Sequence, residues 1–245
     1  TAIGHAKDLG GVKSRYTGPV ELVAKHWPPP DLHFDKIPTD ALDLQALATP
    51  ENDYYVGVRQ AMHVNAPFEA VAKVVANFGE YQKYFPTYKE IRIVEEAPKP
   101  LLTYWEQIVS VFFVPNIKFY LTHDIDTKNP KRFTFRYQMK EANLLESCDG
   151  IIVLEKSGNT TRYTEYSFAE TSPGILRTLG SGVVWSDSLK SYYLATMGMK
   201  LRAENPSWNF EKIMETSKTR YETFDVDAAL EKKGSFYLLG KTAEK

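Results

Sequence analysis

The sequence VNAPFEAVAKVVANFGEYQKYFP, residues 64–86, is the most informative segment of the chain, because a short helix in it is followed at once by a cluster of aromatic side chains. Asn65 can accept hydrogen bonds from the exposed N–H groups of a helix start, and Pro67 suits the first turn, where its missing N–H is not needed. Gly79 predicts the end of this helix, and residues 81–86 predict a second, shorter helical turn that ends at a proline. The apolar side chains on one face of the first helix are Phe68, Val71, Val75 and Phe78.

Alternating apolar and polar residues on both sides of this segment predict strands. One strand precedes it at residues 58–64, and the later ones are expected at residues 91–94, 103–113, 117–125, 132–139, 145–155 and 160–169. Turn residues separate these strands, and Ser157-Gly158-Asn159 predicts a hairpin between the last two. Short connections between consecutive strands are typical of an antiparallel meander.

A long helix is expected after the strands, from about residue 183 until Asn205-Pro206 stops it. Its apolar side chains spread over more than half of the circumference, which is wider than contact with one sheet requires. The helix is therefore either covered on a second side or faces a cavity along part of its length. These apolar residues are Trp185, Leu189, Tyr192, Tyr193, Leu194, Met197, Met199 and Leu201.

This order of elements, together with the junction Val64-Asn65-Ala66-Pro67 and the aromatic segment 77–86, resembles the START-related, birch-pollen-allergen-like superfamily. That superfamily also includes polyketide cyclases and coenzyme Q binding proteins. The resemblance implies an α+β helix-grip fold, in which a curved antiparallel sheet of about seven strands wraps around a long carboxy-terminal helix. It also implies a hydrophobic cavity between sheet and helix, which the aromatic residues at 81–85 would close at one end.

Three zones are expected along the chain. Residues 1–52 form an extended, proline-containing arm, residues 53–204 form the helix-grip domain, and residues 205–245 form a helical extension. Within the arm, residues 39–47 carry a capping threonine and leucines at helical spacing, which predicts one short helix. Within the extension, residues 208–224 and 226–234 each predict a helix that packs on the domain.

Composition restricts the classes of partner. The chain has 245 residues and a formal net charge of −1, so nothing in its charge favours nucleic acid as a partner. The single cysteine, Cys148, excludes an intrachain disulfide and a cysteine-based zinc site, and the five histidines are dispersed, so we expect no metal and no cofactor. No apolar run is long enough for stable membrane insertion, although transient contact with a membrane is compatible with the sequence.

Compartment and assembly are less well defined by the sequence. The chain starts at Thr1 without a methionine, which favours an exported or periplasmic form over a cytoplasmic one. The oligomeric state does not follow from any pattern in the sequence.

The cavity wall can be predicted from strand alternation and helix periodicity. His123 shares a face with Phe119, Leu121 and Ile125, so it should point inward, either as a satisfied core histidine or as a ligand contact. Gln107 shares a face with Trp105 and, like His123, could orient a polar head group. The expected ligand-binding residues are Trp105, Gln107, Phe119, Leu121, His123, Phe135, Tyr137, Trp185, Leu189 and Tyr193.

Three functions are compatible with these features. The first is a non-enzymatic carrier that binds, and in a further step transports, a hydrophobic small molecule such as a lipid, sterol or isoprenoid. The second is a polyketide cyclase or aromatase that uses Tyr137, His123 or Glu165 for acid–base chemistry. The third is a protein-interaction module whose cavity is filled by its own aromatic side chains. Because no catalytic motif is present, we expect binding rather than catalysis.

Overall fold

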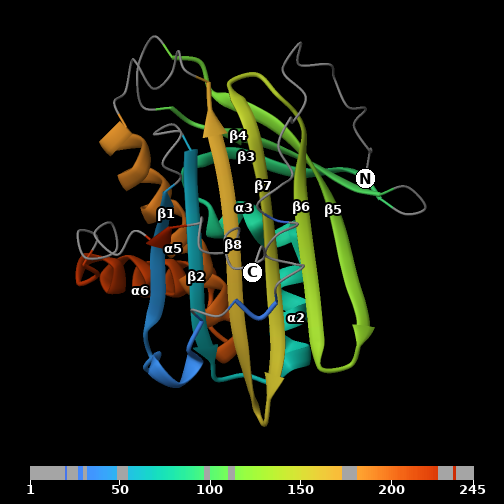
Figure 1. Cartoon of the computed structure of the whole chain (residues 1–245), viewed down its shortest axis with the longest axis vertical. Helices are drawn as coiled ribbons and strands as arrows, with labels where there is room; N and C mark the ends of the chain where they lie inside the picture. The colour runs from blue at the N-terminus through green and yellow to red at the C-terminus, as the bar shows by residue number, and fades with distance from the viewer. Residues whose placement is uncertain are drawn as a thin grey trace, which may run out of the picture.

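The computed structural model describes residues 20, 27–29, 32–48, 55–96, 100–109, 114–172, 181–225 and 234–235. A nine-stranded sheet dominates it, with the strand order β3-β4-β5-β6-β7-β8-β2-β1-β9 (Figure 1). The strands in chain order are β1 (Leu42–Ala48), β2 (Tyr55–Val64), β3 (Tyr88–Glu95), β4 (Leu101–Gln107), β5 (Ile117–Asn129), β6 (Arg132–Ala142), β7 (Leu145–Ser157), β8 (Thr160–Thr171) and β9 (Gly234–Ser235).

The predicted meander is confirmed from β3 to β8, because each of these strands pairs antiparallel with the next. The hairpin between β7 and β8 turns at Gly158, whose φ of 62° lies in the left-handed region that glycine enters without steric strain. β8 then pairs with β2 from the beginning of the domain. The last long strand of the domain thus lies beside its first long strand.

The prediction of a short helix at residues 39–47 is wrong. The segment forms β1, which pairs antiparallel with β2 from Leu42 opposite Met62 to Leu47 opposite Gly57. Leu42, Leu44 and Ala46 alternate with Asp43 and Gln45, so the same leucines satisfy a period of two as well as a helical period. The unpaired backbone edge of β2 favours the extended form, because a strand there satisfies N–H and C=O groups that would otherwise lack partners.

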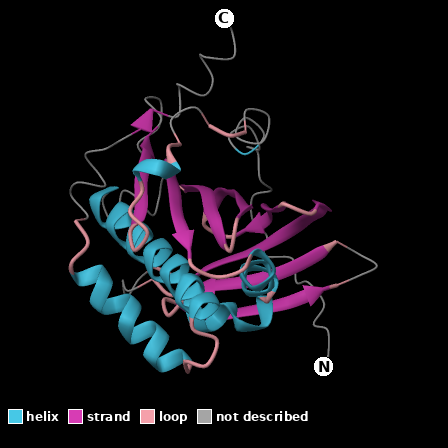
Figure 2. Cartoon of the chain, turned by 90° about the horizontal axis from the view of Figure 1, so that it is seen from below, coloured by secondary structure: helices cyan, strands magenta, loops and turns pink. Residues whose placement is uncertain are grey.

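Within the described ranges, four helices lie on one side of the sheet, and the last of them packs against the long carboxy-terminal one (Figure 2). They are α2 (Phe68–Ala76), α3 (Tyr81–Tyr84), α5 (Ser181–Glu204) and α6 (Phe210–Glu222), with short 3₁₀ turns η1 (Phe34–Lys36) and η2 (Phe78–Glu80). The first helix begins after Pro67 and the second short turn follows it, as expected from residues 64–86. The prediction that Gly79 ends the first helix is wrong, because α2 ends at Ala76 and Gly79 lies inside η2. The expected capping by Asn65 is also not found, since Pro67 is the capping residue and no side chain accepts a hydrogen bond there. The fold is nevertheless the expected α+β helix-grip arrangement.

The wide apolar face of α5 is explained by cover on two sides. Tyr193 packs against Tyr221 and Phe224 near the end of α6, with ring centroids 5.3 and 4.8 Å apart. Residues on the opposite side of α5 face the sheet, so both alternatives from the sequence hold at once. The predicted extension helix at 208–224 corresponds to α6 and packs on the domain.

The predicted zone boundaries at residues 52 and 204 stay predictions. β1, which falls in the expected arm, is hydrogen-bonded into the sheet, and α5 ends at Glu204. Phe34 from the same arm is buried, and its carbonyl oxygen lies 2.9 Å from Nε2 of His63. The helix expected at residues 226–234 falls almost wholly outside the described residues.

Candidate functional site

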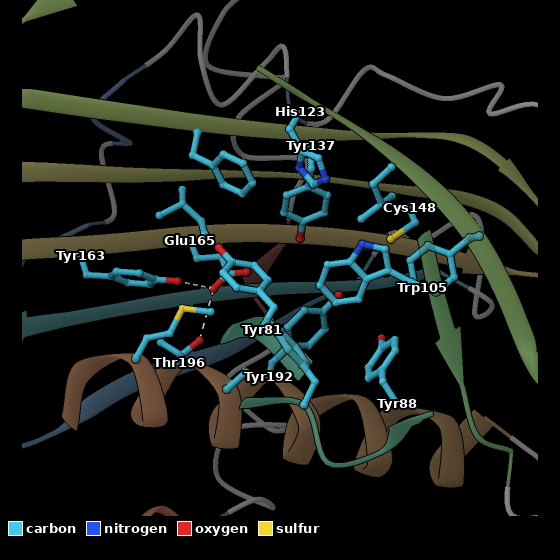
Figure 3. Close-up of a pocket in the computed structure, with 17 residues that line it drawn as sticks. Tyr81, Tyr88, Trp105, His123, Tyr137, Cys148, Tyr163, Glu165, Tyr192 and Thr196 are labelled. Carbon is cyan, nitrogen blue, oxygen red and sulfur yellow. Dashed lines mark hydrogen bonds between the residues drawn. The ribbon is translucent and has the colours of Figure 1, made fainter. Parts of the chain in front are cut away.

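A cavity of about 70 Å³ lies between the sheet and α5, in the middle of the main hydrophobic core. More than half of the side chains around it carry an aromatic ring. Strands β4 to β8 supply one wall, α5 supplies the other, and the segment from α3 to the start of β3 closes one end (Figure 3). The residues around the cavity are Tyr81, Phe85, Tyr88, Trp105, Phe119, Leu121, His123, Phe135, Tyr137, Cys148, Ile152, Tyr163, Glu165, Tyr192, Ala195, Thr196 and Met199.

The structure brings part of the predicted ligand-binding set to this cavity. The predicted residues around it are Trp105, Phe119, Leu121, His123, Phe135 and Tyr137. Gln107 lies at the end of β4 and is only partly buried, Leu189 is packed in the core, and Tyr193 faces α6. The side chain of Trp185 falls outside the described residues. Whether any of them contacts a ligand stays a prediction.

Several cavity residues were not in the predicted set. Tyr192, Thr196 and Met199 lie on the sheet-facing side of α5, which periodicity could not distinguish from the α6-facing side because both sides are apolar. Cys148 and Ile152 lie two positions on either side of Gly150 on β7, so strand alternation alone could have placed them together. Tyr163 and Glu165 share a face of β8 in the same way.

Glu165 is the centre of a buried polar cluster at one side of the cavity. Its Oε2 accepts hydrogen bonds from the hydroxyl of Tyr163 at 2.6 Å, from Thr196 at 3.2 Å and from Nε2 of Gln60 at 3.1 Å. Its Oε1 accepts from the hydroxyl of Ser167 at 2.9 Å. The cluster joins β2 and β8 to α5, and Figure 3 shows Tyr163 and Thr196 pointing at the carboxylate. The sequence left exposed ion pairing open for Glu165, and the structure buries it instead.

The cluster continues through Tyr137 on β6, which is separated from β8 by β7. The hydroxyl oxygens of Tyr137 and Ser167 are 2.5 Å apart, which extends the chain of hydrogen bonds from Glu165 across β8 to β6. Tyr137 lies over Gly150, its cross-strand partner on β7. A Cβ at position 150 would come within 2.1 Å of the Tyr137 ring, so glycine is needed there for close approach.

His123 is part of a second polar group on β4 and β5. Its Nε2 lies 2.6 Å from the hydroxyl of Thr103, and that same hydroxyl accepts a hydrogen bond from Nε1 of Trp105 at 2.7 Å. The His123 ring stacks on Phe135 with centroids 5.3 Å apart. Nδ1 of His123 is buried without a hydrogen-bond partner. The inward orientation expected from alternation is thus confirmed.

A curved antiparallel sheet that encloses an aromatic cavity against one long helix is the arrangement that the sequence resemblance implied. The chain has the helix-grip fold. No family model and no curated protein matches its sequence.

Solved structures with low sequence identity align with part of this chain. TTHA0849 from Thermus thermophilus aligns at 17% identity with a TM-score of 0.49, over 62% of this chain and 99% of that chain. The Zhui aromatase/cyclase from Streptomyces sp. R1128 aligns at 16% identity and a TM-score of 0.43, over 69% and 97% of the two chains. The human StarD13 (DLC2) lipid transfer and protein localization domain aligns at 17% identity and 0.44, over 62% and 85%. Likeness at this level concerns the fold alone.

Burial controls the protonation of the titratable groups around the helix-grip cavity. It raises the pKa of Glu165 above its ordinary value, although the hydroxyl groups of Tyr163, Ser167 and Thr196 act in the opposite direction. It lowers the pKa of His123 to about 3, so this ring is neutral at physiological pH. Burial also raises the pKa of Cys148, which keeps this thiol protonated and makes it a poor nucleophile.

Two further classes of site find no support in the described part of the chain. Among the described residues, no group of three or more His, Cys, Asp or Glu side chains is placed to hold a metal ion. No helix within the described ranges is both long enough and apolar enough to cross a bilayer.

Replacing Gly150 with alanine is expected to lower the free energy of unfolding by about 1–3 kcal/mol, the usual range for an overpacked core. The added methyl group must push the Tyr137 ring into the cavity, because the shortest contact would be 2.1 Å. Urea denaturation of the Gly150→Ala variant measures this loss. Gly79→Ala is the matched control, since a Cβ there would meet its nearest atom, Oδ1 of Asn77, at an ordinary 3.5 Å.

A double variant tests the cause of this loss. Gly150→Ala combined with Tyr137→Ala should show little further loss beyond Tyr137→Ala alone, because the methyl group then has free space. Equal losses from Gly150→Ala in both backgrounds would contradict the steric explanation.

Proposed function

We propose that this chain binds a hydrophobic small molecule in the cavity between the sheet and α5 and shields it from water. The observation that carries the proposal is the aromatic cavity inside an otherwise closely packed core. Protein interiors are closely packed, and voids larger than a water molecule are few in each domain. Apolar burial at roughly 25 cal/mol per Å² of ligand surface would supply the driving force.

The size of the cavity sets a condition on the ligand. Its volume of about 70 Å³ is well below the roughly 300–1,000 Å³ that is usual for ligand pockets. A lipid, sterol or isoprenoid therefore requires the aromatic rings at the closed end to move outward. Tyr81, Phe85 and Tyr88 supply this end. The ring of Phe85 contacts those of Tyr81 and Tyr88, and the ring of Tyr81 also contacts Trp105 of β4. Transport would follow if the same movement releases the ligand.

Native mass spectrometry tests this proposal directly. The purified chain, and the chain incubated with mixed lipids, should carry about one apolar molecule each, which organic extraction then identifies. Ala195→Leu should reduce the bound fraction at least about tenfold, because it adds three carbon atoms to the cavity wall on α5. Ala76→Leu, at an exposed position on α2, is the control for an added leucine outside the cavity.

The contrary result is equally informative. If the wild-type chain stays free of ligand with every lipid tested, and Ala195→Leu raises stability without changing any bound mass, the cavity is only a packing defect. That outcome would support the third function expected from the sequence, an interaction module with a filled core.

An acid–base enzyme is the second candidate, because His123, Tyr137 and Glu165 all lie on the wall of one cavity. A buried carboxylate with a raised pKa is suited to proton transfer near neutral pH. In an enzyme of the cyclase type, Glu165→Gln should abolish turnover of a polyketide-like substrate and change its affinity little. In a carrier, the same variant should leave the retention of a purely apolar ligand nearly unchanged.

A further inference from the structure

The direction of the hydrogen bonds around Glu165 can be deduced from its partners. An ionised carboxylate only accepts hydrogen bonds, so Tyr163, Ser167, Thr196 and Gln60 must all donate to it. Each hydroxyl group has a single proton, and that proton is used in the bond to Glu165. The oxygen atoms of Tyr163 and Thr196 therefore present only lone pairs to the cavity.

The same reasoning fixes the direction of the Tyr137 hydroxyl. The proton of Ser167 goes to Glu165, so Tyr137 must donate its own proton to Ser167 across the 2.5 Å contact. The oxygen of Tyr137 then also presents lone pairs. With Glu165 ionised, the hydroxyl groups of Tyr137, Tyr163 and Thr196 therefore offer the cavity hydrogen-bond acceptors and no donor.

The charge of Glu165 has no partner in the described part of the chain. None of the ion pairs between described residues includes Glu165, and no cation is among the groups that shift its pKa. A buried, unpaired negative charge is costly, and a ligand cation would remove this cost. The aromatic rings of Tyr81, Tyr137 and Tyr192 around the carboxylate can also attract a cation through their π faces.

We propose that the ligand of this cavity carries a protonated amine, which lies against the hydroxyl oxygens around Glu165 and compensates its charge. The inference rests on the proposed function and narrows it, because it selects cationic amphiphiles or small aromatic amines and excludes fatty acids and other anions. Glu165 is the residue that determines this specificity.

A neutral Glu165 would have the opposite preference. Its own proton would need an acceptor, so Ser167 or Thr196 would turn its hydroxyl proton toward the cavity and offer a donor. The cavity would then favour a ligand acceptor such as a carbonyl oxygen. An amine that binds must therefore displace the proton of Glu165, and the release of this proton is measurable.

Matched probes separate these two states. Isobutylamine and benzylamine are compared with their uncharged isosteres, isobutanol and benzyl alcohol, and with benzoate as the anion. Isothermal titration calorimetry of the full chain at pH 5 and pH 8, in buffers with different ionisation enthalpies, gives both the affinity and the number of protons released. Both amines remain protonated across this range.

We expect each amine to bind about tenfold more tightly than its alcohol at pH 8, because a hydrogen bond to a charged group is the stronger kind. The affinity of the amines should fall and the proton release should grow as the pH is lowered, because the amine and the proton compete for Glu165. Alcohols should show neither effect. Glu165→Gln should remove the preference for amines and the proton release, whereas Glu170→Gln, on the same strand but outside the cavity wall, should keep both.

Other titrating groups can be separated from Glu165. The phenols that face it from α3, β6, β8 and α5 are Tyr81, Tyr137, Tyr163 and Tyr192, and burial raises the pKa of each, so they remain protonated. His123 on β5 is neutral throughout this range. Asp149 has a pKa of about 7, but its side chain lies on the other face of the sheet. The Asp149→Asn variant should therefore release the same number of protons on amine binding as the wild-type chain.

Four results would overturn the inference. Alcohols that bind as tightly as amines, or a preference for amines that Glu165→Gln leaves intact, would show that Glu165 does not recognise a cation, and the proposed function would stand unchanged. Tighter binding of benzoate would have the same meaning. Failure of every probe and every lipid to bind would overturn the proposed function itself, and this inference with it. The proton count is measured on the wild-type chain, so it does not depend on the stability of any variant.

Discussion

Replacing Lys200 with alanine is expected to lower the free energy of unfolding by about 3 kcal/mol, in the range for breaking a buried charge pair. Lys200 lies on α5 with only 2% of its side chain exposed, and its Nζ donates to Oε1 of Glu204 at 2.7 Å and to the backbone carbonyl oxygens of His63 and Thr39. Without Nζ, these two carbonyl oxygens lose this donor and Glu204 loses its cation.

The position of Lys200 explains why its loss should affect the whole domain. Glu204 also accepts a hydrogen bond from the backbone N–H of Asn65 at 2.7 Å, so the pair ties the end of α5 to the junction between β2 and α2. The contact with Thr39 adds the segment before β1. One charged side chain thus joins the long helix to the segment before β1 and, together with Glu204, to the junction between β2 and α2.

Urea denaturation of two variants checks this expectation. Lys200→Met keeps the apolar stem and should lose nearly as much stability as Lys200→Ala, because the loss comes from the unpaired carbonyls and carboxylate. Lys190→Ala removes an exposed lysine from the same helix and should change stability by no more than about 0.5 kcal/mol. If Lys200→Met were as stable as the wild type, the apolar stem rather than the charge would hold α5 in place.

Much of the fold can be predicted from local patterns in the sequence. The strands of the meander have one polar face along part of their length, so apolar and polar residues alternate there and indicate a strand. β5 is the clearest case, since its alternation placed His123 and Phe119 correctly on the inner face. The helix predicted for residues 39–47 was wrong because the spacing of the leucines in this segment fits both a helix and a strand. The choice between them depended on a free edge of β2, which is a tertiary feature that no local pattern contains.

The cavity was harder to predict than the fold, for physical reasons that particular residues make clear. Tyr193 was expected on the cavity wall and Tyr192 lies there instead, because α6 covers the second side of α5 and makes both sides equally apolar. β8 is buried on both faces, so its sequence shows no contrast that would assign Glu165 to one of them. Cavity volume depends on how the rings pack together, and composition carries no record of it.

Replacing Asp149 with asparagine is expected to stabilise the chain in a pH-dependent way, by about 3–4 kcal/mol more at pH 8 than at pH 4. Asp149 is 3% exposed, and its only hydrogen bond among those between described residues comes from the backbone N–H of Met139, at a long 3.3 Å. Burial raises the pKa of its carboxyl group to about 7, and this single hydrogen bond opposes the shift only in part.

The sign of the effect follows from proton binding. Between pH 4 and pH 7 the folded chain holds a proton on Asp149 that the unfolded chain has released, so folding is favoured at low pH and stability falls as pH rises. The penalty is complete above pH 7, where the buried carboxylate is charged. Asparagine keeps the acceptor for Met139 and is never charged, so it removes the penalty while resembling the protonated acid in shape and hydrogen bonding.

Thermal and urea unfolding of the wild type and the Asp149→Asn variant at several pH values should therefore give curves that converge near pH 4 and separate up to pH 7. The difference between the two proteins is the useful quantity, because the other buried groups contribute equally to both. His123, for example, acts with the opposite sign, since a pKa lowered to about 3 makes the folded chain lose stability as pH falls below 6.5. Asp126→Asn removes an exposed carboxylate from the same sheet and serves as the control. A wild-type minus variant difference that stays constant from pH 4 to pH 8 would mean that Asp149 is ionised in the folded chain at no cost, and that water or a polar group reaches it from the outer face of the sheet.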